Sequence, residues 1–184
     1  ETRHLMDDNI LEIRGLTVDL PASGDRKHAV SGLDLAICKD EIVCVVGESG
    51  SGKSVTARSI LGLLPSWVRP SAGQILLRGD DLLQAGPERM RQVRGAEISM
   101  IFQEPMTALN PLTTVGDQVD EAIAIHRGQS RKARLVRGRE RVSAGLRPDP
   151  HRIYRSYPHQ LSGGQRQRAM IAMELALEPA LLIA

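Results

Sequence analysis

The segment Gly47–Ser54 constrains this chain more than any other, because it reads Gly-Glu-Ser-Gly-Ser-Gly-Lys-Ser. It fits the phosphate-loop pattern G-x-x-x-x-G-K-[S/T]. The fixed positions of that pattern are filled by Gly47, Gly52, Lys53 and Ser54. Glycines let several backbone N–H groups point at one anion, and a following helix adds the positive end of its dipole. The segment therefore predicts a phosphate-binding site, and a glycine-rich turn that binds nothing is the weaker alternative.

The flanks of this segment supply the strand and the helix that a phosphate loop requires. Ile42–Val46 is a short run rich in β-branched residues, which predicts a buried parallel strand. From Ser54 to Leu64 the apolar residues follow helical spacing, and Pro65 is expected to end that helix.

Two side chains of the loop have predicted roles in binding a magnesium nucleotide. Lys53 can reach the β- and γ-phosphates as a point charge, and the Ser54 hydroxyl is placed to ligate Mg²⁺. The predicted nucleotide-binding residues of this part of the chain are Gly47, Glu48, Ser49, Gly50, Ser51, Gly52, Lys53, Ser54 and Val55.

Composition narrows the class of protein. The chain has 184 residues, of which 41% are hydrophobic and 25% charged, as expected for one globular domain. Its net charge of +2 is too small to indicate a nucleic-acid partner, and no apolar run of membrane-spanning length is present in the sequence. Cys38 and Cys44 are expected to be reduced residues in or near the core of a cytosolic protein.

Hydrophobic periodicity predicts further elements along the chain. Alternating apolar residues predict two antiparallel strands, over 11–20 and 33–37, and shorter strands are expected at 75–77, 98–102 and 181–184. Helical patterns cover 88–94 and begin again at Thr114. The arginine-rich stretch 127–141 is interpreted as the solvated face of a helix; a polyanion site is the alternative, and it lacks aromatic stacking partners.

A second glycine-containing motif reads Ser162-Gly163-Gly164-Gln165. Locally it predicts a capping box, with Ser162 as the N-cap of a helix that reaches Leu177. Functionally it could be a second anion site, because a glycine-backed helix N-terminus can hold phosphate oxygens. Taken alone, the motif favours the cap.

Together the two motifs resemble the nucleotide-binding domains of ABC (ATP-binding cassette) transporters. Leu161–Gln165 matches the signature motif of that family, and Gln103, after an apolar strand, matches its Q-loop. The resemblance runs from Ile10 onward. Three segments are most similar in sequence to the ATPases of peptide/nickel (oligopeptide and dipeptide) importers. They are the phosphate loop, Phe-Gln-Glu-Pro-Met-Thr-Ala-Leu-Asn-Pro and Tyr-Pro-His-Gln-Leu-Ser-Gly-Gly-Gln-Arg-Gln-Arg.

This resemblance implies an α/β fold of the P-loop NTPase class. Such a domain has a RecA-like core with an antiparallel β-subdomain and a helical subdomain. On this chain the expected bounds are 10–103 and 161–184 for the core and about 104–160 for the helical subdomain, with a disordered N-terminus at 1–9. The helical subdomain would dock on a membrane partner.

The resemblance also implies roles for individual residues. Two such domains meet head to tail, so that Ser162, Gly163, Gly164 and Gln165 of one domain face the phosphate loop of the other, with Ser162 and Gly164 on the γ-phosphate. Gln103 would sense Mg²⁺ and the attacking water, which makes Gln103 and Lys53 the implied catalytic residues and Ser54 and Gln103 the implied metal-binding ones. The implied cofactors are ATP and Mg²⁺.

The implied protein is a peripheral subunit on the cytoplasmic face of the cell membrane that couples ATP hydrolysis to import of a solute, most plausibly a peptide. Its implied partners are a second ATPase subunit, transmembrane permease subunits and, indirectly, a solute-binding protein, with no nucleic acid. The alternatives are a catalytically inactive nucleotide-binding fragment and, less favoured, a soluble ABC-type ATPase that acts on nucleic acid or ribosomes.

Three departures from the family pattern bear on these expectations. Leu20 stands where the family has an aromatic residue that stacks on adenine, and Glu174 replaces a small residue in the signature helix. The family also has an Asp and a Glu directly after the strand that Leu181–Ala184 begins. We therefore expect a C-terminally incomplete domain that binds nucleotide weakly, hydrolyses it poorly and is marginally stable.

Overall fold

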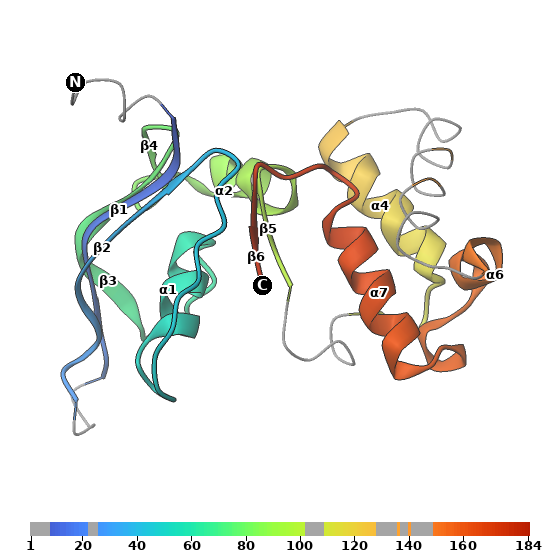
Figure 1. The fold of residues 1–184 in the computed structure, drawn as a ribbon, viewed down its shortest axis with the longest axis horizontal. Coiled ribbons are helices and arrows are strands. Elements are labelled where there is room, and N and C mark those ends of the chain that lie inside the picture. The colour runs from blue at the N-terminus through green and yellow to red at the C-terminus, as the bar shows by residue number, and fades with distance from the viewer. Residues whose placement is uncertain (1–7, 22–25, 102–108, 128–135, 137–139, 141–148) are drawn as a thin grey trace. The chain divides into compact units, whose positions relative to one another are not determined.

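The computed structural model describes residues 8–21, 26–101, 109–127, 136, 140 and 149–184 (Figure 1). It divides the chain into two compact units, Glu1–Arg91 and Gln92–Ala184, and each is described by itself. Three subjects of the sequence predictions lie outside the described residues: the N-terminus before residue 8, the Q-loop residue Gln103 and nearly all of the arginine-rich stretch after residue 127.

Among the described residues, the first unit contains a four-stranded antiparallel sheet of order β2-β1-β3-β4 (Figure 1). The strands are β1 (Asn9–Asp19), β2 (His28–Cys38), β3 (Arg69–Leu77) and β4 (Asp80–Asp81). The predicted antiparallel pairing of the first two strands is confirmed, with Val18 opposite Val30 near the turn. Both strands are longer than the apolar alternation indicated, because pairing continues through their polar ends.

A bulge in β1 keeps two pairs of apolar residues on the same face of the sheet. Leu11 and Ile13 are fully buried, and so are Leu16 and Val18, although the spacing of the second pair is shifted by one residue. The register shifts between Ile13 and Leu16, where Gly15 takes a φ of 56°. An extra residue in one strand reverses the alternation of sides, so all four side chains reach the core.

Helix α1 spans Lys53–Ile60 and ends before the predicted Pro65. Its C-cap is Leu61, and Gly62 follows at a φ of 59°. The Gly62 amide donates to the Ser59 carbonyl at 3.1 Å, and the amide of Leu63 donates to the carbonyl of Arg58 at 2.8 Å. These two bonds form a Schellman motif. The prediction that Pro65 stops the helix is therefore wrong, because a left-handed glycine ends it first.

The predicted parallel strand at Ile42–Val46 is also wrong in this structure. The run is irregular, and Ile42 and Val46 are 92% and 91% exposed. Cys44, expected in or near the core, is exposed with them. A β-branched run forms a strand only when neighbouring strands complete its hydrogen-bond ladder, and none of the described strands pairs with this one.

The second unit joins a short parallel strand pair to a group of helices. Strands β5 (Ile98–Met100) and β6 (Leu181–Ile183) pair in parallel. They correspond to the strands predicted at 98–102 and 181–184. The helices are α4 (Val115–Arg127), α6 (Pro150–Arg155), the 3-10 turn η1 (Pro158–Gln160) and α7 (Gly163–Glu174). Helix α2 (Pro87–Ala96) begins in the first unit, ends in the second and is interrupted at Gly95, which has a φ of 82°.

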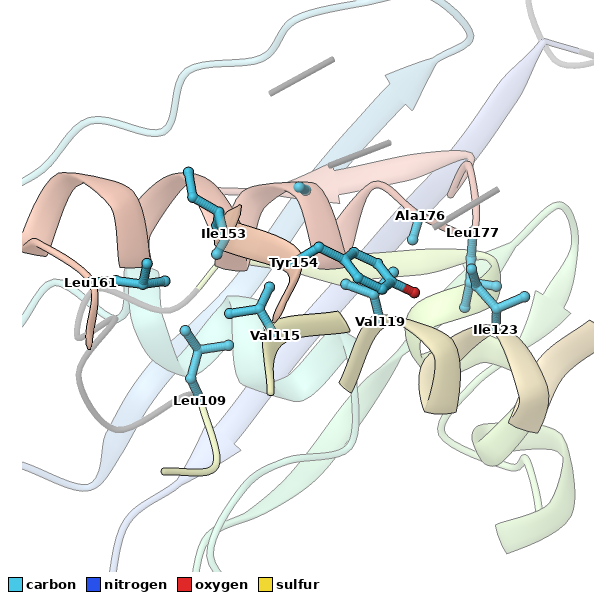
Figure 2. Close-up of a cluster of buried hydrophobic side chains, with 11 residues drawn as sticks. Leu109, Val115, Val119, Ile123, Ile153, Tyr154, Leu161, Ala176 and Leu177 are labelled. Carbon is cyan, nitrogen blue, oxygen red and sulfur yellow. The ribbon is translucent and has the colours of Figure 1, made fainter. Parts of the chain in front are cut away.

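A hydrophobic cluster holds these helices together (Figure 2). Val115, Val119 and Ile123 recur every four residues on α4 and point into the cluster. They pack with Ile153 and Tyr154 of α6, with Ala169 and Ala172 of α7, and with Ala176 just after α7. Leu161 joins the cluster at only 3% exposure, so the residue directly before the Ser162 motif is anchored in the core.

No helix in the part of the chain that the structure describes combines the length and the apolar character needed to cross a membrane.

Candidate functional site

The phosphate loop wraps around the start of α1 with two glycines in the left-handed region. Gly50 and Gly52 have φ values of 80° and 93°, which residues with a Cβ rarely adopt. Gly52 is the N-cap of α1, and its carbonyl accepts the amide of Thr56 at 2.8 Å. A Cβ on Gly52 would lie 2.5 Å from the carbonyl oxygen of Ala29, at the beginning of β2. The loop backbone therefore packs directly on the sheet at a position that only glycine fits.

The Lys53 ammonium lies over the backbone of this loop. Its Nζ donates to the carbonyl oxygens of Gly47 and Glu48 at 2.5 and 2.8 Å, and to the Ser51 hydroxyl at 3.2 Å. A Cβ on Gly47 would come within 2.7 Å of that same hydroxyl. The loop and its lysine thus form a cradle that added side-chain atoms would fill, as phosphate binding requires.

Nothing within α1 itself neutralises the positive end of its dipole. The N-cap makes no side-chain hydrogen bond, and the first turn contains no acidic residue. Ser54, the predicted magnesium ligand, lies exposed in this first turn. Among the described residues no group of three His, Cys, Asp or Glu side chains could hold a metal ion. Ser54 and Gln103, the latter outside the described residues, stay the predicted ligands of a divalent cation.

A second cation, Arg26, contacts the phosphate loop. Arg26 Nη1 donates to the Gly50 carbonyl at 3.2 Å, across 24 positions in the sequence. The sequence analysis did not select Arg26. A single basic residue outside a motif carries no sequence signal, so this contact is seen only in the structure.

The second motif forms the predicted capping box at the start of α7. Ser162 is the N-cap: its hydroxyl accepts the amide of Gln165 at 3.4 Å, and the Gln165 side chain accepts the amide of Ser162 at 3.0 Å. Gly163 and Gly164 are exposed, and a Cβ on Gly163 would meet no atom within 4 Å. The local interpretation of this motif is confirmed, and its role toward a phosphate stays a prediction.

The far end of α7 carries a partly buried carboxyl group. The Ser99 hydroxyl of β5 donates to the Glu174 carboxylate. Burial raises the pKa of Glu174, and the Ser99 hydrogen bond opposes that shift. Glu174, which the sequence marked as a departure, therefore joins the signature helix to the strand that leads toward Gln103.

The structure groups the predicted site residues in two places. Residues 47–55 form the loop and first turn of α1 in the first unit, and residues 162–165 form the start of α7 in the second. The catalytic and binding roles assigned to both groups stay predictions.

Residues 30–184 match the family described as ABC transporter. The chain is 46% identical, over 178 residues, to the dipeptide transport ATP-binding protein DppD of Bacillus subtilis (strain 168), covering 96% of this chain and 53% of that protein. It is 43% identical over 182 residues to the glutathione import ATP-binding protein GsiA of Salmonella typhimurium, covering 96% of this chain and 29% of that protein. Against DppD, the chain spans about half the length of the relative.

Solved structures give the same result for the fold. The dimeric structure of MJ0796, a bacterial ABC transporter cassette, superposes with a TM-score of 0.79 at 28% identity, over 94% of this chain and 72% of that one. A post-hydrolysis dimer of MJ0796 bound to ADP and Pi superposes with a TM-score of 0.78. The predicted fold class, an ABC-type P-loop NTPase, is confirmed.

Proposed function

Because this chain belongs to the ABC transporter family, we propose that it is the ATP-binding part of an importer that couples ATP binding and hydrolysis to uptake of a peptide or a related small solute. The names of its relatives support this proposal, since they are dipeptide, peptide and glutathione import ATP-binding proteins.

The observation that carries the proposal is the phosphate loop with the Lys53 ammonium over its carbonyl oxygens, at the N-terminus of α1. When bound, ATP supplies the phosphoanhydride bond whose hydrolysis drives transport. The loop N–H groups and Lys53 would bind the phosphate oxygens, and the Ser54 hydroxyl would be a ligand of Mg²⁺. Gln103, outside the described residues, would position Mg²⁺ and the attacking water.

The exposed N-terminus of α7 is proposed to complete the site of a second subunit. In a head-to-tail dimer, Ser162 and the two glycines after it would contact the γ-phosphate held by the partner's phosphate loop. The dimeric cassette among the structural relatives supports this arrangement. The core at 10–103 and 161–184 and the helical subdomain at about 104–160 are proposed as the parts of this ATP-binding domain.

The same proposal places the protein peripherally on the cytoplasmic face of the membrane. Its partners would be transmembrane permease subunits, which carry the solute, and indirectly a solute-binding protein that delivers it. The import ATP-binding names of the relatives are the support for these partners.

The proposal is tested by peptide uptake in cells that lack the natural gene product and are complemented with variants of it. Wild type and the control Arg58→Ala, an exposed cation in the last turn of the same helix, should restore uptake. Lys53→Ala should abolish uptake and weaken MgATP binding by about tenfold or more, since it removes the charge over the loop. Full uptake with Lys53→Ala would contradict the proposal. Binding of MgATP without hydrolysis by wild type would favour the alternative of an inactive nucleotide-binding protein.

A further inference from the structure

Arg26, two residues before β2, brings a positive charge to the phosphate loop. Arg26 is exposed, and its Nη1 donates to the Gly50 carbonyl at 3.2 Å. The same nitrogen lies 3.8 Å from the place of a Cβ on Gly50. The guanidinium therefore lies against the middle of the loop, at one of its two left-handed glycines.

Contacts between the end of β1 and the start of β2 hold the backbone next to Arg26 in place. The amide of Leu20 donates to the Lys27 carbonyl at 3.0 Å, and His28 Nδ1 lies 2.7 Å from the Asp19 carboxylate. The hydrogen bond with His28 lowers the pKa of Asp19. The next residue, Ala29, packs its backbone carbonyl against Gly52. Arg26 therefore lies three residues before a close contact between β2 and the phosphate loop.

Two cations consequently converge on the same short stretch of backbone. Lys53 donates to the carbonyl oxygens of Gly47 and Glu48, and Arg26 donates to that of Gly50. A guanidinium carries five N–H donors in a planar fork, and the Gly50 contact uses one of them. The remaining donors suit the oxygens of a phosphate, which arginine binds with charge-assisted and often paired hydrogen bonds.

We propose that Arg26 is a second phosphate-binding cation of this site, which binds the phosphate oxygens of a nucleoside triphosphate together with Lys53. This inference rests on the proposed function, because it assumes that the loop binds a nucleotide. It adds a residue from outside the loop motif to the binding set.

A structural role for Arg26 predicts something different. If its task were only to brace the loop through the Gly50 carbonyl, any side chain that keeps an N–H donor there would suffice. Arg26→Gln keeps such a donor without the charge, whereas Arg26→Lys keeps the charge without the planar fork. The neighbouring exposed cation Lys27 is the matched control, since its charge lies near Asp19 and not on the loop.

The test is calorimetric titration of MgATP into the natural gene product and its variants. We expect Arg26→Ala and Arg26→Gln to weaken binding by about tenfold, or ~1.4 kcal/mol, because both lose a charge-assisted contact. Arg26→Lys should stay within about threefold of wild type, and Lys27→Ala should bind as wild type does. Inorganic tripolyphosphate, which has neither base nor sugar, should show the same order of variants.

Four results would overturn the inference. Wild-type affinity in Arg26→Gln would assign Arg26 to bracing alone, and equal losses in Lys27→Ala and Arg26→Ala would reduce its effect to general surface charge. A loss seen with MgATP and absent with tripolyphosphate would place Arg26 on the base or sugar. If wild type itself fails to bind MgATP, the proposed function fails; if wild type binds and Arg26→Ala binds equally well, only the inference fails.

Discussion

Helices α1 and α7 both begin behind glycine-containing turns, but they satisfy their first amides differently. At α7 the Ser162 hydroxyl accepts an amide of the first turn, and the Gln165 side chain accepts the amide of Ser162 in return. At α1 the N-cap is Gly52, which has no side chain to offer, and cations from residues 26 and 53 contact the loop carbonyls. One helix start is closed by its own side chains, and the other is the one proposed to bind an outside anion.

The far ends of the two helices share backbone bonds and differ in one side-chain contact. Helix α1 ends with the amides of Gly62 and Leu63 bonded to carbonyls of its last turn. Helix α7 ends with the amides of Leu175 and Ala176 bonded to carbonyls of its own last turn. In addition, the partly buried carboxyl group of Glu174 at the end of α7 accepts a hydrogen bond from Ser99 of β5, which ties this helix to a strand.

The largest expected difference in stability lies between two glycine-to-alanine substitutions, one at the start of each helix. Gly52→Ala should cost about 3 kcal/mol in the free energy of unfolding, because it combines a left-handed φ with a Cβ against the Ala29 carbonyl. Gly163→Ala should leave that free energy unchanged or raise it by up to about 1 kcal/mol, since alanine favours helix and the site is open. Urea unfolding of both variants measures the difference, and equal effects would remove the distinction between the two helix starts.

Removal of a serine hydroxyl should have a medium effect at α7 and a small one at α1. Ser162→Ala deletes the N-cap acceptor and should cost about 1 kcal/mol of stability. Ser54→Ala, within the first turn of α1, removes no capping bond and should change stability by less than about 0.5 kcal/mol. Denaturant midpoints of the two variants check this, and a larger loss for Ser54→Ala would show that α1 relies on a cap of its own.

The smallest effect is the pH dependence that Glu174 contributes. Its pKa is raised in the folded state, so the stability gained from the neutral carboxyl is complete below the ordinary glutamate pKa and is lost as pH rises through the raised one. Glu174→Gln should therefore become more stable than wild type as pH rises from about 4 to about 7. The exposed Glu121→Gln is the control, and thermal unfolding across this range is the measurement. Lower stability of Glu174→Gln at pH 7 would mean that the charged Ser99 contact outweighs burial.

Sequence patterns predicted the parts of this molecule that local chemistry determines. The capping box at Ser162 follows from two residue types at fixed spacing, and β1 and β2 follow from alternation beside a turn. The phosphate loop is predictable because Gly47, Gly52, Lys53 and Ser54 fill the fixed positions of its motif, and Gly52 takes the positive φ that favours glycine.

The failures concern features that depend on distant neighbours. Ile42–Val46 has the composition of a strand, but a strand requires partners that composition does not specify. The end of α1 was assigned to Pro65 because proline is the stronger helix breaker, although the left-handed Gly62 comes first. The Arg26 contact was missed because it joins two residues 24 positions apart in the sequence, and no motif links them.

The central claim is that the start of α1 binds an outside phosphate, whereas the start of α7 is capped by its own side chains. Amide hydrogen exchange with and without MgATP tests this claim most directly, because it reports on both helix starts in one experiment. We predict that the amides of residues 47–54 gain at least about tenfold protection at saturating MgATP, since bound phosphate oxygens replace water as their partners. Lys53→Ala should lose this gain, while the capped amide of Gln165 is already protected without nucleotide. Unchanged exchange across residues 47–54 in wild type would contradict the account.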